Sequence, residues 1–186
     1  DAYQDKLAIP NPAGTTTGLL FLLWTIDRFG ADGYLDYWQD LVDNGARILD
    51  SWNTVYTQFE EGEVPVIVSF SNDRVYAKRF GNSLDKHRVS LLNDQGYANL
   101  AGMARFSGGS KPELAYEFMD FILEPEVQKV IAERNVTGPV NTAAEPPEVF
   151  QQYAKDSEES VFFGYDELDG NLDGWITDWS RQIASR

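Results

Sequence analysis

The sequence of 186 residues contains no cysteine and only one histidine, His87. Without cysteine the chain has no disulfide framework, no thiol nucleophile and no zinc site built on thiolates. A single histidine argues against a multi-histidine metal site and against a catalytic triad that uses histidine as the base. Long hydrophobic runs are also missing. The longest, at 18–24, is far shorter than the ~18 residues of a membrane span, and no basic segment precedes it, so it is not a signal peptide.

Positive charge is scarce. The chain holds 15 Lys and Arg against 30 Asp and Glu, which gives a formal net charge of −15. Nucleic acids and anionic membranes bind basic surfaces, so we expect neither as a partner. The 42% of hydrophobic residues, with 5 Trp, 9 Tyr and 11 Phe, indicate a folded protein with a sizeable core.

Two explanations of the acidity remain open. A field of one sign can steer a cationic ligand toward a protein. Alternatively, an excess of surface carboxylates keeps a protein soluble, as in proteins adapted to high salt. The acidic residues spread along the chain and lysine is rare, so we favour the second explanation and expect a protein from a salty environment. His87 lies in a charged stretch at 85–88, which predicts a solvated loop.

Strand and helix patterns alternate along the chain, which indicates the α/β class. The uniformly apolar run at 66–68 predicts a strand covered on both faces. The predicted strands lie at 6–9, 47–49, 64–70, 89–92 and 97–106. The predicted helices lie at 19–30, 34–43, 52–60, 76–80, 125–133 and 174–185, and two more begin at a capping box over 110–113 and at prolines 146–147. The helix after the capping box is expected to bury its apolar side chains, namely Leu114, Phe118, Phe121 and Ile122.

The loop at 11–18 leads from the first strand into a helix and contains Thr15, Thr16 and Gly18. Free N–H groups and hydroxyls at a helix N-terminus bind phosphate or carboxylate well, helped by the helix dipole. The lysine of a Walker loop is absent. The alternative is a turn followed by a plain threonine-capped helix.

Three aromatic residues occupy comparable places. Trp52 begins the predicted helix that follows the strand at 47–49. Phe70 ends the predicted strand at 64–70, and Tyr76 begins the helix that follows the next loop. In open α/β sheets these positions line the ligand crevice, where aromatic rings can stack on a flat or cationic heterocycle. The alternative is that the three rings belong to the core.

A weak metal candidate lies near the C-terminus, where Asp169, Asn171 and Asp173 match the first half of a calcium loop. The position of the expected bidentate glutamate holds Ser180, so an acidic turn that caps the last helix is the alternative. Carboxylates are numerous, yet no spacing singles out an acid and base pair for catalysis.

Further motifs follow one another over the whole chain. They are Asn11-Pro12-x-x-Thr15-Thr16-x-Gly18, Trp52-x-x-x-Tyr56-x-x-Phe59, Val68-Ser69-Phe70 with Tyr76, Lys111-Pro112-Glu113-Leu114-Ala115, Pro139-Val140-Asn141 and Trp175-Ile176-x-x-Trp179. With these motifs the chain resembles the C-terminal portion of the substrate-binding proteins of thiamine ABC transporters, within the type II periplasmic-binding-protein superfamily. The Pro-Glu-Leu-Ala and Pro-Val-Asn motifs are general to the superfamily. The aromatic residues Trp52, Phe70, Tyr76, Trp175 and Trp179 are more specific to the thiamine branch.

The resemblance implies an α/β, type II periplasmic-binding-protein-like fold with one lobe plus part of the other. Residues 1–97 and 142–186 would form the second lobe, and residues 98–141 an excursion into a first lobe that is largely missing. The resemblance also implies a non-enzymatic, extracytoplasmic component of an ABC importer, periplasmic or anchored to the outer face of the membrane. Such a protein passes a small-molecule ligand to a permease and needs no cofactor.

The resemblance assigns ligand contacts as well. Thr15, Thr16 and Gly18 match the position that holds the phosphate of thiamine phosphates, and Trp52, Phe70 and Tyr76 match aromatic contacts to the ligand. Two positions depart from the thiamine branch, since Phe70 is more often tyrosine there and Val136 replaces a tryptophan. Another small solute, such as ferric iron or a small anion, therefore stays open beside thiamine, and so does a calcium-stabilised structural module.

Overall fold

The protein is described by a computed structural model that covers residues 3–155, 157 and 159–184. The chain divides into two compact units. Unit 1 comprises Asp1–Phe70, Leu91–Asn99 and Ser157–Arg186, and unit 2 comprises Ser71–Ser90 and Leu100–Asp156. Among the described residues, 71–90 and 142–155 belong to unit 2, whereas the predicted second lobe included both segments. The assignment of each unit to a lobe of a larger protein stays a prediction.

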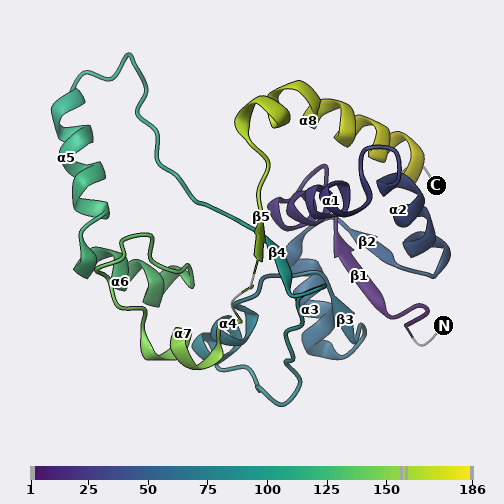
Figure 1. Cartoon of the computed structure of the whole chain (residues 1–186). Coiled ribbons are helices and arrows are strands. Elements are labelled where there is room, and N and C mark those ends of the chain that lie inside the picture. The colour runs from purple at the N-terminus through teal and green to yellow at the C-terminus, as the bar shows by residue number, and fades with distance from the viewer. Residues whose placement is uncertain (1–2, 156, 158, 185–186) are drawn as a thin grey trace. The chain divides into compact units, whose positions relative to one another are not determined.

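Unit 1 is built on a three-stranded parallel sheet in the order β2-β1-β3 (Figure 1). Its strands are β1 (Leu7–Pro10), β2 (Arg47–Leu49) and β3 (Val66–Ile67). The central strand is covered on both faces. Ala8 packs in a cluster with Val55 and Val64, and Ile9 packs in the main core. The covered strand is thus β1, whereas β3 at the sheet edge is shorter than predicted and only half-buried.

Helices cover the two faces of this sheet, with α3 on one face and α1, α2 and α8 on the other (Figure 1). Their bounds are α1 (Thr16–Phe29), α2 (Tyr34–Asp43), α3 (Trp52–Glu61) and α8 (Tyr165–Trp179), the last continued by a π-helix, η1 (Ser180–Ala184). The first three agree with the predicted ranges to within a few residues. The last helix begins well before the predicted residue 174, and the predicted end at residue 185 lies outside the described residues.

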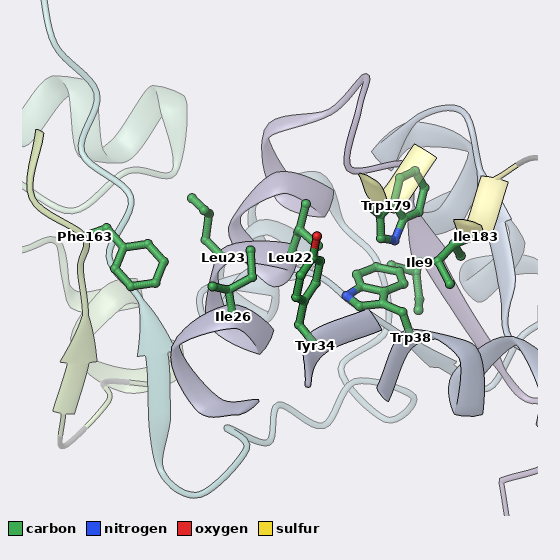
Figure 2. Close-up of a cluster of buried hydrophobic side chains, with 9 residues drawn as sticks. All are labelled: Ile9, Leu22, Leu23, Ile26, Tyr34, Trp38, Phe163, Trp179 and Ile183. Carbon is green, nitrogen blue, oxygen red and sulfur yellow. The ribbon is translucent and has the colours of Figure 1, made fainter. Parts of the chain in front are cut away.

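The core of unit 1 is rich in tryptophan (Figure 2). Trp38 and Trp179 are fully buried, and their rings meet edge to face at 5.3 Å. The indole N–H of Trp38 donates to Thr25 Oγ1 at 3.0 Å, and that hydroxyl donates to the Leu22 carbonyl at 2.6 Å. Tyr34 is also buried, and desolvation followed by the charge of Asp178 raises the pKa of its phenol to about 12. Hydrogen bonds thus satisfy the Trp38 indole and the Thr25 hydroxyl in this core.

A second, two-stranded parallel sheet in unit 1 pairs β4 (Gln95–Tyr97) with β5 (Glu159–Val161). The Phe163 N–H donates to the Tyr97 hydroxyl at 3.1 Å. The predicted strand at 89–92 is reduced to an isolated antiparallel bridge between Leu92 and Gln95, so that prediction is wrong. The predicted strand at 97–106 is wrong beyond the end of β4 at Tyr97, although the Ala98 N–H still donates to the Val161 carbonyl at 2.9 Å. The side chain of Phe106, in that segment, is 89% exposed. Strand β5 was not predicted, since its three residues show no apolar alternation.

Unit 2 is helical. Its helices are α4 (Asp73–Phe80), α5 (Pro112–Ile122), α6 (Pro125–Asn135) and α7 (Glu148–Tyr153). Its small core joins α4, α6 and α7 through Val75, Ala132, Val136 and Phe150. His87, which belongs to the same unit, is buried, and its Nδ1 donates to the Ser83 carbonyl at 2.8 Å. The predicted solvated loop is therefore wrong at this residue.

Helix α5 departs from its prediction in two ways. It begins at Pro112 after Lys111 and has no side-chain cap, so the capping box from Ser110 does not form. None of its residues is buried, and the rings of Phe118 and Phe121 are about half exposed. Its apolar face is thus uncovered by the residues that the structure describes. Within that same part of the chain, no helix is long and apolar enough to cross a membrane.

Candidate ligand-binding site

The carboxyl ends of the three parallel strands of unit 1 meet at one edge of the sheet. Five of the six predicted site residues follow these ends. They are Thr15, Thr16 and Gly18 after β1, Trp52 after β2 and Phe70 after β3. The Asn11 N–H donates to the Leu49 carbonyl at 2.8 Å, which ties the loops after β1 and β2 together. This edge is the candidate site.

A threonine caps α1, as the alternative reading of the loop expected, and that threonine is Thr15. Its hydroxyl accepts the N–H of Gly18 at 3.1 Å and donates to the Asn11 carbonyl at 2.8 Å. Gly18 lies against the preceding loop, and a Cβ there would be 2.1 Å from the Pro10 carbonyl oxygen. Glycine is therefore required at this position by the close approach of helix and loop.

Most N–H groups of this loop are already used within it. Those of Gly14 and Thr15 donate to the Asn11 carbonyl, and that of Ala13 donates to Asn11 Oδ1 at 2.9 Å. First-turn amides lack an acceptor within the helix, so the N–H groups of Thr16 and Thr17 remain at the helix end. Together with the exposed Thr16 hydroxyl they are the donors that this helix end has left for an anion.

The aromatic part of the site is a cluster around Trp52. Its half-buried ring stacks on Tyr56 with centroids 4.8 Å apart and planes inclined by 27°, and Phe70 lies 6.0 Å away. The Trp52 indole N–H donates to Ser69 Oγ at 2.7 Å, which fixes the ring across two elements. We call these four residues, Trp52, Tyr56, Ser69 and Phe70, the indole cluster.

Two members of the indole cluster were not predicted as site residues. Tyr56 lies one helical turn after Trp52, so the spacing i, i+4 in a predicted helix could have placed it beneath that ring. Ser69 precedes Phe70 in a motif of the sequence, but its pairing with an indole 17 residues away depends on the sheet. Tertiary structure alone reveals that contact.

Tyr76, the sixth predicted residue, belongs to unit 2. It lies on α4 and packs beside the small core of that unit. Its ring centroid lies 4.4 Å from that of Phe80. Val136, at the position where the thiamine branch carries tryptophan, is buried in the same core and has a positive φ of 56°. Its side chain therefore packs rather than presenting a surface.

The calcium candidate is overturned by the secondary structure. Asp169, Asn171 and Asp173 lie inside α8, not in a loop that could wrap around an ion. The Asn171 side-chain amide donates to the Glu167 carbonyl one turn earlier, at 2.8 Å. Across the described segments, no group of three or more acidic or histidine side chains could hold a metal ion.

The sequence comparisons agree with this geometry. Residues 2–156 match the family model of bacterial extracellular solute-binding proteins. The chain belongs to that family. It is 26% identical to the thiamine-binding periplasmic protein of Escherichia coli (strain K12) over 98% of its own length, and 26% identical to that of Brucella suis biovar 1 over 94%. A solved periplasmic thiamin binding protein shares the fold, with a TM-score of 0.83 over 96% of the chain and 24% identity.

The chain spans about half the length of the curated relatives it matches, 53% and 52% for the two named above. The predicted type II periplasmic-binding-protein-like α/β fold is confirmed, and so is the resemblance to the thiamine branch. These relatives are named as binding proteins, not as enzymes. The family is one of extracellular proteins, in agreement with the predicted extracytoplasmic location.

Proposed function

We propose that the protein is the solute-binding component of an ABC importer and that it binds thiamine or a thiamine phosphate at the carboxyl edge of the sheet in unit 1. The observation that carries the proposal is the indole cluster. Trp52 is held by Tyr56 and by the hydrogen bond to Ser69, so its ring is ordered before a ligand arrives. An ordered ring binds a ligand without a further cost in side-chain entropy.

The chemistry of the cluster fits a cationic heterocycle. The thiazolium ring of thiamine carries a permanent positive charge, and tryptophan is the best aromatic partner for a cation. Phe70 adds an apolar ring 6.0 Å from Trp52. The N–H groups of Thr16 and Thr17 are the donors that a phosphate ester would use.

The remaining parts of the proposal come from the relatives. Their names support thiamine as the ligand and support binding without catalysis. An ABC permease is the partner that such a protein would supply. The contact between Tyr76 and the ligand stays a prediction from the resemblance.

Titration calorimetry of the full-length protein with thiamine tests the proposal. We expect binding with a Kd well below about 1 mM, since stacking on an ordered cluster and cation–π attraction act together. Trp52→Ala removes the ring and should weaken binding at least about tenfold, because such contacts contribute over about 1.4 kcal/mol when desolvated.

The matched control is Phe162→Ala, which removes an exposed ring elsewhere in unit 1. It should leave the Kd for thiamine unchanged. The proposed site would be contradicted if the protein did not bind thiamine, or if Trp52→Ala and Phe162→Ala lost the same amount of affinity for it.

A further inference from the structure

The negative charge of the protein is concentrated in unit 1. By sequence, the segments of unit 1 hold 19 Asp and Glu against 5 Lys and Arg, and those of unit 2 hold 11 against 10. Unit 1 therefore carries almost the whole net charge of −15, and it also carries the indole cluster.

The few basic residues of unit 1 lie away from the candidate site. Lys6 and Arg47 are at the amino ends of β1 and β2, and Arg28 is in the last turn of α1, opposite Thr15. Arg181 follows α8 and pairs with Asp178 at 3.8 Å. Of the unit 1 residues that the structure describes, no lysine or arginine follows a strand at the carboxyl edge.

An acidic residue lies there instead. Asp50 directly follows β2, is exposed, and precedes Ser51, the N-cap of α3, and Trp52. Within the described chain its carboxylate forms no ion pair. The carboxylate thus adds negative charge two residues from the ring proposed to bind the ligand.

The same edge offers little to a phosphate. The hydroxyl of Thr15 and the N–H of Gly18 are bonded to each other, and three more loop N–H groups are turned toward Asn11. Two amides and one hydroxyl of this loop remain, and none of the described lysines or arginines of unit 1 follows a strand at this edge to support them. A phosphate group brings about two negative charges into this negative field, and its desolvation would go largely uncompensated.

We infer that the site selects an unphosphorylated aromatic cation and that Asp50 determines this selectivity. The inference rests on the proposed function and narrows it to one of its two ligand classes. The carboxylate attracts the ring cation at short range, and the surplus of carboxylates on unit 1 raises the rate of encounter with cations. Both effects oppose thiamine monophosphate and diphosphate.

Calorimetry with thiamine, thiamine monophosphate and thiamine diphosphate tests the inference on the full-length protein and on Asp50→Asn, Asp50→Lys and Asp40→Asn. Asp40 is an exposed acidic residue on α2, so Asp40→Asn removes the same charge away from the edge. In the natural protein thiamine should bind tightest. Asp50→Asn should raise the Kd for thiamine about fivefold, as expected for the loss of an exposed ion pair. Asp40→Asn should change this Kd less than about twofold.

Asp50→Lys should invert the order and favour the phosphates. The inference is overturned if the natural protein binds a phosphate ester more tightly than thiamine, or if Asp50→Asn and Asp40→Asn change the Kd for thiamine equally. Either result leaves the proposed function standing. Binding of none of the three ligands overturns both. Circular dichroism of each variant verifies that the affinities compare folded proteins.

Discussion

At the scale of single residues, the candidate site depends on contacts that leave little freedom. Thr15 caps α1 and is itself held by Asn11, while Gly18 lets the helix approach the loop. The Trp52 ring is oriented by Tyr56 and Ser69. The residue types at these positions follow from geometry before any ligand is considered.

Gly18→Ala should destabilise the protein by about 2 kcal/mol, because the new methyl group must displace the Pro10 carbonyl or α1. The expected fall in Tm is about 6 °C. Gly14→Ala in the same loop is the control, since a Cβ there meets nothing within 4 Å. Thermal denaturation followed by circular dichroism measures both; similar Tm values for the two variants would contradict the described packing.

Alkaline pH should destabilise the protein, and Tyr34 should contribute to that loss. Its pKa is raised to about 12 in the folded state, so the folded protein retains the phenolic proton that the unfolded chain loses near pH 10. The free energy of unfolding is therefore unaffected by this group below about pH 10 and falls as the pH rises toward 12.

Tyr34→Phe should flatten this alkaline fall, whereas Tyr3→Phe, at an exposed tyrosine, should not. Urea unfolding at a series of pH values gives the comparison. An identical alkaline slope in Tyr34→Phe and in the natural protein would show that other groups cause it.

At the scale of elements, the sequence was most informative where local chemistry decides the structure. The helices predicted at 19–30 and 34–43 correspond to α1 and α2, although α1 begins three residues earlier than predicted, at Thr16. The strands were harder to predict from the sequence, because β4 and β5 are three-residue segments that form only by pairing with each other. The positions of Trp52 and Phe70 after strand ends could be predicted from the sequence, but the hydrogen bond of Trp52 to Ser69 required the fold.

Helix α5 provides an element-scale prediction. Phe118 is half exposed on α5 and Phe150 is buried in the core of the same unit. Phe150→Ala should cost about 3 kcal/mol of unfolding free energy, and Phe118→Ala less than about 1 kcal/mol. Urea denaturation measures the free energy of unfolding of both variants; equal costs would show that the side chain of Phe118 is packed as closely as that of Phe150.

At the scale of the whole molecule, the charge distribution is uneven, so the acidity combines two effects. The carboxylates of unit 1, including those on α2 and α8, contribute to solubility and to mutual repulsion. By our inference they also contribute to the negative potential at the candidate site. The origin of the protein in a salty environment stays a prediction.

Added salt should stabilise the protein by screening this repulsion. Raising the NaCl concentration from about 0.1 M to about 1 M shortens the screening length from about 10 Å to about 3 Å and should raise Tm. The double variant Asp40→Asn, Asp173→Asn removes two exposed carboxylates of unit 1 and should show a smaller rise. A Tm that does not respond to salt would contradict this account of the charge.

We propose that the indole cluster of unit 1 holds the ligand, and a crystal structure of the full-length protein with thiamine tests this. We expect the thiazolium or pyrimidine ring to lie against the Trp52 indole, within about 4 Å. Thiamine bound elsewhere, with Trp52 and Phe70 free of contact to it, would contradict the proposal.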